Sequence, residues 1–243
     1  MQKPEVLTTL GRFNGNYPKL LNNKHLILNK DGQFTPAKGG QNHWFFHSKP
    51  KGVNYYQNLG SAYHKVGQFK KEKRLYRKAK RDFPGSPLIV YNQAILALTE
   101  GDVVAANRYI EKYVSILKDN SWPEAAIENR LAGIYSEAGT LDKAEGYYRK
   151  AASLEPSYSY NFARFLIDKE RNVNEGLEII NKILDLDPNN YWYLNWKGWA
   201  FYKQGKYKEA LELLQKSDSL KSIFTPTLYF HLEEVKKALA GQK

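Results

Sequence analysis

One spacing of small, aromatic and glycine residues recurs along this chain and limits its possible folds more than any other feature. A small residue is followed by an aromatic residue three positions later and by a glycine seven positions later. The pattern occurs in Gly60-x-x-Tyr63-x-x-x-Gly67, Ala132-x-x-Tyr135-x-x-x-Gly139 and Gly198-x-x-Phe201-x-x-x-Gly205. Self-similarity of this kind predicts a chain built from one structural unit that is stacked several times.

Each position of the pattern has a physical role in a helix–turn–helix unit. The small residue lets two helices approach closely, and the aromatic residue fills the space beside it. The glycine ends the first helix, where a positive φ is needed. Prolines then stop the second helix of three units, at Pro84, Pro156 and Pro188. The sequence therefore predicts pairs of helices, each pair joined by a short turn.

This pattern resembles the tetratricopeptide repeat, a helix–turn–helix of about 34 residues. Two weaker copies lie between the clear ones, and the inter-helix turn of the copy at 157–190 is one residue longer. The resemblance implies an all-α fold, an α-solenoid that winds as a right-handed superhelix over residues 53–241. We expect repeats at about 53–86, 87–122, 125–156, 157–190 and 191–224, followed by a capping helix at 226–240.

Residues 1–52 show no helical period and are expected to form a separate, β-like segment. Asn29-Lys30-Asp31-Gly32 lies between apolar residues, and an Asp-Gly pair in that setting indicates a β-hairpin. Because two strands are hard to stabilise alone, we expect the segment to lean on the first repeat through Trp44, Phe45 and Phe46. It is equally consistent with the end of a larger domain.

The positive charge of the chain is concentrated in two segments. The net charge is +12, and residues 1–52 and 68–82 each carry eight cations and two anions, so the remainder is neutral. The second segment predicts a basic patch on one helix of the first repeat: Lys70, Lys71, Arg74, Arg77, Lys78 and Arg81. Such a patch can attract nucleic acid or anionic lipid, and the ordinary alternative is a solvated cationic surface.

No catalytic or cofactor-binding motif occurs in the sequence. It has no glycine-rich phosphate loop, no Gly-x-Ser-x-Gly elbow and no cysteine. His43 and His47 have a spacing that two metal ligands can use, but no nearby carboxylate completes a site. We therefore expect no enzyme, no cofactor and no metal.

The chain carries no address that identifies its compartment. No apolar run reaches the roughly 18 residues that span a bilayer, and the start of the chain holds no apolar core of a signal peptide. We expect a soluble protein, either cytoplasmic or, as a processed fragment, part of a bacterial cell envelope.

The surface of the repeats is then the candidate for function. In repeats of this kind the first helices line a concave groove, and the resemblance places one asparagine of every repeat there: Asn58, Asn92, Asn129, Asn161 and Asn195. A carboxamide both donates and accepts, so a row of them can hold an extended peptide backbone without reading its sequence. The same face is expected to hold Tyr91, Arg164, Trp192, Trp199 and Tyr202.

The aromatic residues of the fifth repeat allow two interpretations. Trp192, Trp196, Trp199 and Tyr202 share one helical stripe. If it is exposed, the stripe is an anchor for a ligand; otherwise it packs against the capping helix through Tyr229 and Phe230. We expect Trp196 to be buried, and Trp192 and Trp199 to be reachable.

These features predict a non-catalytic protein-interaction module that binds a protein or an extended peptide in the concave groove. Two alternatives stay open. The basic patch is consistent with binding of nucleic acid or an anionic membrane, and steep loss of binding with salt would favour that function. The chain is also consistent with an accessory domain of a larger enzyme whose catalytic part precedes residue 1.

Overall fold

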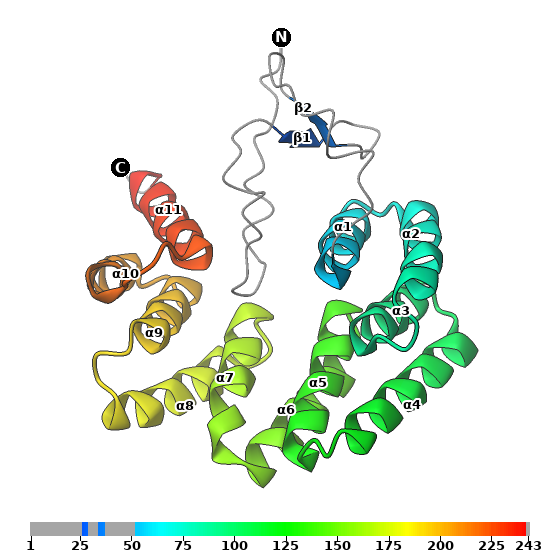
Figure 1. Ribbon diagram of the computed structural model, residues 1–243. Helices are drawn as coiled ribbons and strands as arrows, with labels where there is room; N and C mark the ends of the chain where they lie inside the picture. Colours follow the sequence, from blue (N-terminus) through cyan, green and yellow to red (C-terminus); the bar gives the residue numbers. More distant parts are fainter. Residues whose placement is uncertain (1–25, 29–33, 37–51, 242–243) are drawn as a thin grey trace. The chain divides into compact units, whose positions relative to one another are not determined.

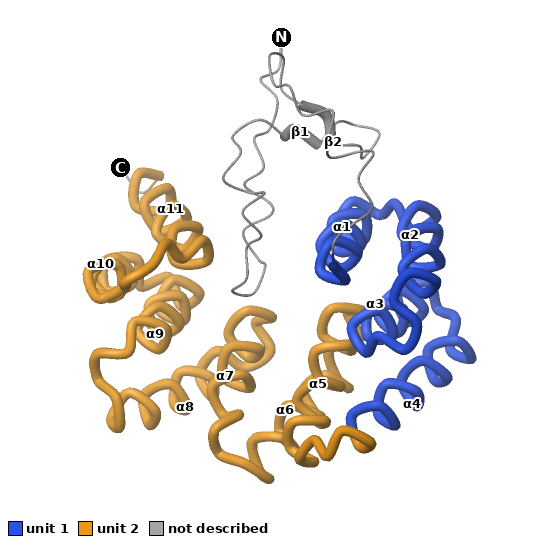
Figure 2. The backbone as a smooth tube through the Cα atoms, viewed as in Figure 1, with its two compact units in different colours: residues 1–117 blue, residues 118–243 orange. Residues whose placement is uncertain are grey.

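The computed structural model describes residues 26–28, 34–36 and 52–241. These residues form two short strands, eleven α-helices and one 3₁₀ turn. The chain divides into two compact units, residues 1–117 and 118–243 (Figure 2). Within 52–241, every helix is too short or too polar to cross a lipid bilayer.

A small antiparallel hairpin is the only sheet among the described residues. Strand β1 (Leu26–Leu28) pairs with β2 (Phe34–Pro36), with Leu26 opposite Pro36 and Leu28 opposite Phe34. Asp31-Gly32 lies in the connection between them, in agreement with the hairpin that this dipeptide predicts. The expected contact of residues 44–46 with the first repeat lies outside the described residues.

The first unit contains helices α1 (Val53–Lys65), α2 (Phe69–Asp82) and α3 (Pro87–Thr99), and most of α4 (Val103–Asp119), shown in Figure 1. Its core is formed by Tyr56, Tyr76, Ala79, Ile89 and Leu96. Gly60 of α1 faces the ring of Tyr76 on α2, where a Cβ atom would overlap that ring. The small residue of the repeat pattern is therefore required by a close helix–helix approach.

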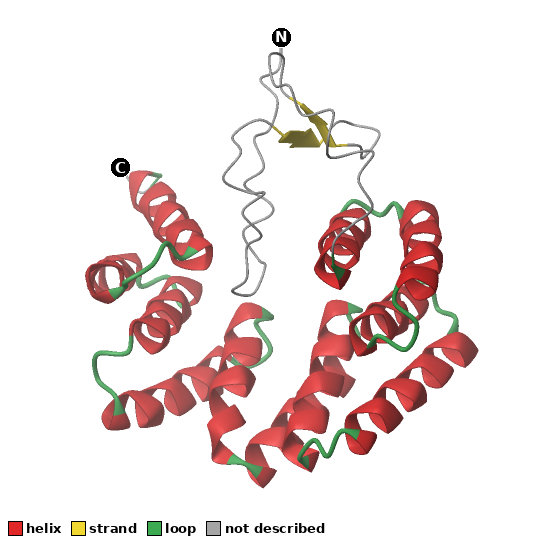
Figure 3. Ribbon diagram, in the orientation of Figure 1, coloured by secondary structure: helices red, strands yellow, loops and turns green. Residues whose placement is uncertain are grey.

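The second unit continues the same alternation of first and second helices along the chain (Figure 3). It consists of α5 (Glu124–Glu137), α6 (Leu141–Leu154), a 3₁₀ turn (Pro156–Tyr158), α7 (Ser159–Asp168), α8 (Val173–Leu186), α9 (Tyr191–Lys203), α10 (Tyr207–Leu220) and α11 (Pro226–Ala240). The last helix packs Leu228, Leu232 and Val235 against Ala210 and Leu214 of α10. The described chain is thus an all-α array of helix–turn–helix units with a capping helix.

Glycines in the left-handed region join the two helices of most units. Gly67, Gly101, Gly139 and Gly205 have φ between 70° and 80°, and no atom lies within 4 Å of where their Cβ would be. Their role is therefore conformational. In the turn between α7 and α8, Glu170 takes this conformation with φ 53°, and Arg171 N donates to Leu166 O at 3.0 Å to close the helix.

That turn is one residue longer than the others, and the additional position is used to cap α8. Asn172 is the N-cap residue: its Oδ1 accepts from Glu175 N at 3.1 Å, and its Nδ2 donates to the Glu175 carboxylate at 3.2 Å. A side-chain cap of this kind satisfies a backbone N–H that the helix leaves without a partner. The longer turn therefore keeps a left-handed residue and adds a side-chain cap for α8.

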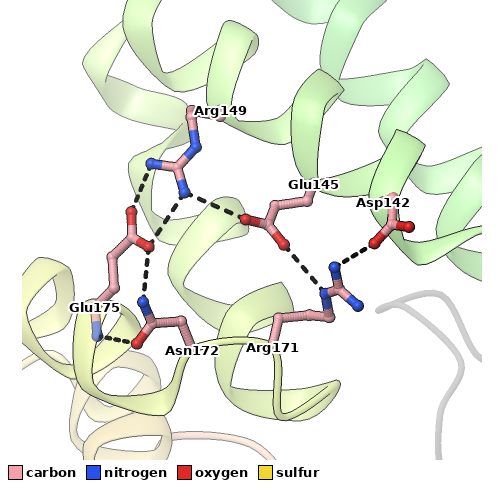
Figure 4. A network of polar contacts seen from close by, with 6 residues as sticks. All are labelled: Asp142, Glu145, Arg149, Arg171, Asn172 and Glu175. Carbon is pink, nitrogen blue, oxygen red and sulfur yellow. Dashed lines mark hydrogen bonds and ion pairs between the residues drawn. The ribbon is translucent and has the colours of Figure 1, made fainter.

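A network of charged side chains connects α6 with the start of α8 (Figure 4). Arg149 donates to both oxygens of Glu175, at 2.6 and 3.2 Å, and to Glu145 at 3.3 Å. Arg171 donates to Glu145 at 3.1 Å and also to Asp142. The hydrogen bonds from Arg149 to Glu175 raise the pKa of the guanidinium. The cations of this surface are therefore paired with acids of the neighbouring repeat.

Candidate functional site

Two of the predicted asparagines meet on neighbouring first helices of the second unit. Asn161 on α7 donates from Nδ2 to Oδ1 of Asn129 on α5 at 3.0 Å. Both side chains are half-buried. The amide of Asn129 and the carbonyl of Asn161 have no other partner among residues 52–241, so a donor and an acceptor lie together and remain available. This pair can satisfy one peptide group of a bound chain.

Arg164 lies one turn further along α7, among aromatic rings. Its guanidinium carbon is 6.0 Å from the centroid of the Trp196 ring, and the rings of Tyr160 and Tyr193 are 5.2 Å apart. Burial raises the pKa of Tyr160 to about 12, although the nearby Arg164 cation opposes this. Arg164 is half-buried and has no ion pair with a described carboxylate. A partly desolvated guanidinium of this kind attracts carbonyl or carboxylate acceptors.

The capping helix α11 covers the end of the predicted row, and this corrects two expected site residues. Asn195 is 0% exposed, and its Oδ1 lies 2.9 Å from His231 Nδ1. Trp199 is 5% exposed and lies between two parallel rings, Tyr202 at 4.4 Å and His231 at 4.0 Å. The prediction that Asn195 and Trp199 face a ligand is therefore wrong, because α11 occupies that side of α9.

The other aromatic residues of α9 differ in exposure. Trp196 is buried, as expected, with its ring edge-on to His231 at 5.2 Å. Trp192 is 37% exposed beside Tyr191, whose ring centroid is 4.9 Å away. Tyr202 is half-buried, because one of its faces is covered by Trp199. Trp192 and Tyr202 therefore remain reachable on α9.

In the first unit the predicted residues are less accessible than expected. Asn92 is 4% exposed and donates from Nδ2 to Leu88 O of its own helix at 2.7 Å, so it is also removed from the candidate site. Asn58 is half-buried. Tyr91 is half-buried with its ring edge-on to Tyr113 at 5.5 Å. The complete row of five accessible asparagines is therefore not formed.

A partly buried chain of polar side chains links the first three helices of the first unit. His64 Nδ1 lies 3.0 Å from an oxygen of the buried Glu72, and His64 Nε2 lies 3.3 Å from Thr99 Oγ1. The order of carboxylate, imidazole and hydroxyl is that of a nucleophile with its base. However, the Thr99 hydroxyl donates a hydrogen bond to Ile95 O at 3.0 Å and is therefore not activated by His64. These polar side chains instead connect α1, α2 and α3.

The basic patch is exposed at five of its six predicted positions. Lys70, Arg74, Arg77, Lys78 and Arg81 are exposed on α2. Lys71 is half-buried, and its Nζ lies 5.9 Å from the centroid of the Tyr63 ring. Among the described residues, no group of three or more His, Asp or Glu side chains is arranged to hold a metal ion.

His231 decides which residues of α9 are covered, and its role was not predicted from the sequence. It lies on α11 between Leu228 and Val235, on the face of the helix that is buried. A histidine within an apolar stripe needs a buried polar partner, and Asn195 of α9 is that partner. This signal was present in the sequence, because residues 228, 231 and 235 share one helical face.

Comparison with known proteins identifies the repeat. Models of the tetratricopeptide repeat match residues 53–81 and 129–158, and a further model of the same repeat matches residues 179–212. No curated protein resembles the chain closely enough in sequence to serve as a relative. The matched segments cover helix pairs in both units.

One solved structure of low sequence identity shares the fold, and two others match with lower TM-scores. A tetratricopeptide repeat protein from Parabacteroides merdae is 17% identical, with a TM-score of 0.50 over 79% of this chain and 74% of that chain. Yeast Tom70 is 18% identical, with a TM-score of 0.49 over 78% of this chain and 40% of that chain. PilW, a type IV pilus biogenesis factor, is 15% identical, with a TM-score of 0.45 over 77% of this chain and 86% of that chain. The helix pairs, the left-handed turns and the family matches together show that the chain is a tetratricopeptide repeat protein.

Proposed function

We propose that this protein binds a segment of a partner protein, in extended conformation, along the first helices α5 and α7 of the second unit. The tetratricopeptide fold is typical of protein-interaction modules, but a fold alone does not locate a binding site. The observation that carries the proposal is the pair formed by Asn129 and Asn161. It leaves one donor and one acceptor in register on adjacent first helices.

Arg164 supports the same location. It is next to Asn161 on the helical surface, three residues further along α7, so the two side chains share one face. The guanidinium lies near the ring of Trp196 rather than beside a carboxylate. A segment whose peptide group pairs with the asparagines would bring a carbonyl or an acidic side chain within reach of this cation. The proposed ligand is therefore an extended segment with an acidic residue close to the paired peptide group.

The test starts from an extended-peptide display library that is panned against the full chain. Peptides that survive are remeasured against the double variant Asn161→Ala/Arg164→Ala. Removing one carboxamide and one charged donor is expected to weaken binding by at least about tenfold, since hydrogen bonds to charged groups contribute about 1.5–3 kcal/mol. Enrichment of Asp or Glu at one peptide position is also expected.

A matched control comes from the second helix of the same repeat. Glu178 and Lys182 are exposed on α8, so Glu178→Ala/Lys182→Ala removes two charged side chains from the second unit without touching α5 or α7. This variant is expected to bind the selected peptides as the unaltered chain does. Equal losses of peptide affinity in both variants would contradict this site. Unchanged affinity in Asn161→Ala/Arg164→Ala would also place the ligand elsewhere.

A further inference from the structure

The exposed cations of α2 form a straight row. Lys70, Arg74, Arg77, Lys78 and Arg81 follow the spacing i, i+4, i+7, i+8 and i+11, which defines one face of a helix. All five side chains are exposed. At 1.5 Å per residue the row is about 16 Å long. The opposite face of α2, with Glu72, Tyr76 and Ala79, is buried.

Neither acid of α2 forms an ion pair with a member of this row. Glu72 is buried against His64 at 3.0 Å, and Asp82 accepts a hydrogen bond from Tyr56. Lys73, whose Nζ lies 2.8 Å from Glu100, lies outside the row. No member of the row has an ion pair with a carboxylate of residues 52–241, so its five positive charges are unpaired there.

Two cations of another second helix, α6, are paired with carboxylates. Arg149 of α6 has two carboxylate partners (Figure 4). Lys150 of the same helix lies 2.7 Å from Glu128 and 3.0 Å from Glu124. Cations without an ion pair among the described residues also occur on other second helices, such as Lys182 of α8 and Lys208 of α10, but on α2 five of them share one face.

The arrangement of these charges works against the stability of α2. Lys70 and Arg74, Arg74 and Lys78, and Arg77 and Arg81 are like-charge pairs at i, i+4. Each such pair destabilises a helix by about 0.2–0.5 kcal/mol. Lys70 also lies in the first turn, where the helix dipole disfavours a cation. This repulsion brings no benefit to a surface that contacts only water. A bound polyanion would reduce it.

We propose that this row binds the phosphate backbone of a nucleic acid. Three of its five members are arginines, whose planar guanidinium can donate two hydrogen bonds to one phosphate. A helix that lies in a membrane surface also presents apolar side chains for insertion, whereas the apolar residues of α2 point into the first unit. No exposed aromatic residue belongs to the row, so the contact reads phosphates rather than bases.

Salt dependence of binding measures the number of contacts directly. The full chain is titrated into a labelled duplex of about 20 base pairs while salt is raised from about 0.05 to 0.3 M, with anisotropy as the readout. Five contacts predict a slope of log K against log salt of about −4.5. The variant Arg74→Gln/Arg77→Gln/Arg81→Gln is expected to reduce this slope to about −2 and to weaken binding about 100-fold at about 0.1 M salt.

A control of equal charge keeps the test specific to the row. Lys182, Lys208 and Lys216 are exposed on second helices of the second unit, and changing all three to glutamine alters net charge by the same amount. This control is expected to bind within about threefold of the unaltered chain, since the row itself is intact. Circular dichroism of both variants verifies that the helices remain folded.

Three outcomes would overturn the proposal. Equal losses in the two triple variants would show that net charge alone attracts the duplex. Unchanged binding in the arginine variant would assign binding to another part of the chain. Binding to vesicles that contain anionic lipid, lost in the arginine variant, with no binding to the duplex, would assign the row to a membrane surface.

Discussion

Replacing Trp199 by alanine separates a structural from a ligand-binding role for the aromatic stripe of α9. The ring is 5% exposed and lies between Tyr202 and His231, with centroid distances of 4.4 and 4.0 Å. The interplanar angles are 8° and 7°, so both neighbours stack on it. Removing the ring leaves a cavity between α9 and α11 that neither flat neighbour can fill by a small movement. We therefore expect Trp199→Ala to destabilise the second unit.

The magnitude follows from the buried area and the two stacks. An aromatic side chain buries about 150–250 Å², which at about 25 cal/mol per Å² corresponds to about 4–6 kcal/mol. Alanine retains part of this, and large-to-small changes of buried tryptophan are found to cost about 3–5 kcal/mol. The expected loss for Trp199→Ala is about 4 kcal/mol. Trp192, which is 37% exposed, is the matched control, and Trp192→Ala is expected to cost below about 1 kcal/mol.

Urea unfolding of the full chain, followed by circular dichroism, measures both losses by linear extrapolation. Repeat proteins can unfold in more than one step, so the transition that contains α9 to α11 is the one that should move. A loss below about 1 kcal/mol for Trp199→Ala, or equal losses for the two variants, would contradict the stacked and buried environment. That result would instead support the hypothesis that Trp199 contacts a ligand.

Three further predictions test other parts of the structure. His64→Ala is expected to destabilise the first unit by about 3 kcal/mol, because the buried Glu72 loses its partner. Urea unfolding measures this loss. If adding Glu72→Leu restores the free energy of unfolding, the unpaired carboxylate is the cause. Gly60→Ala is expected to destabilise the packing of α1 on α2, because the added Cβ would overlap the ring of Tyr76. Gly146→Ala, with no atom within 4 Å of the added Cβ, is expected to stabilise α6 by about 0.5–1 kcal/mol. Melting temperatures that rank the two variants in the opposite order would contradict the packing. Burial raises the pKa of Tyr160 to about 12. The stabilising contribution of this neutral hydroxyl is complete below about pH 10, the pKa of an unfolded tyrosine, and is lost as pH rises toward 12. The free energy of unfolding should therefore fall over that interval, and it should fall less in Tyr160→Phe.

The sequence predicted the repeats because their rules are local. Gly67, Gly139 and Gly205 take the left-handed conformation that their place after a helical period implies. Gly60 packs closely against α2 as a small residue at that position should. These features depend on contacts within one helix pair, so one stretch of sequence is enough to reveal them.

The site was harder to predict because exposure depends on what packs next. Asn195 and Asn161 lie one position apart in their repeats, counted back from the left-handed residues Gly205 and Glu170. Asn195 is buried and Asn161 is half-buried. Asn195 is covered because α11 packs on α9 and supplies His231, which bonds to Asn195. A repeat pattern gives the face of each residue but does not say whether a later helix lies over that face. Glu170 takes the left-handed place that glycines hold in the other turns, two residues after the first helix, so residue type alone did not mark that turn.

The two proposals place different chemistry on different helices, and this makes them independent. The α5–α7 face uses neutral carboxamides and one guanidinium beside a ring, so its binding depends on geometry and should survive moderate salt. The α2 row uses five exposed cations without acids, so its binding depends on counterion release and should not survive high salt. Because the residues belong to separate units and to first and second helices respectively, loss of one activity in a variant leaves the other as an internal control for folding.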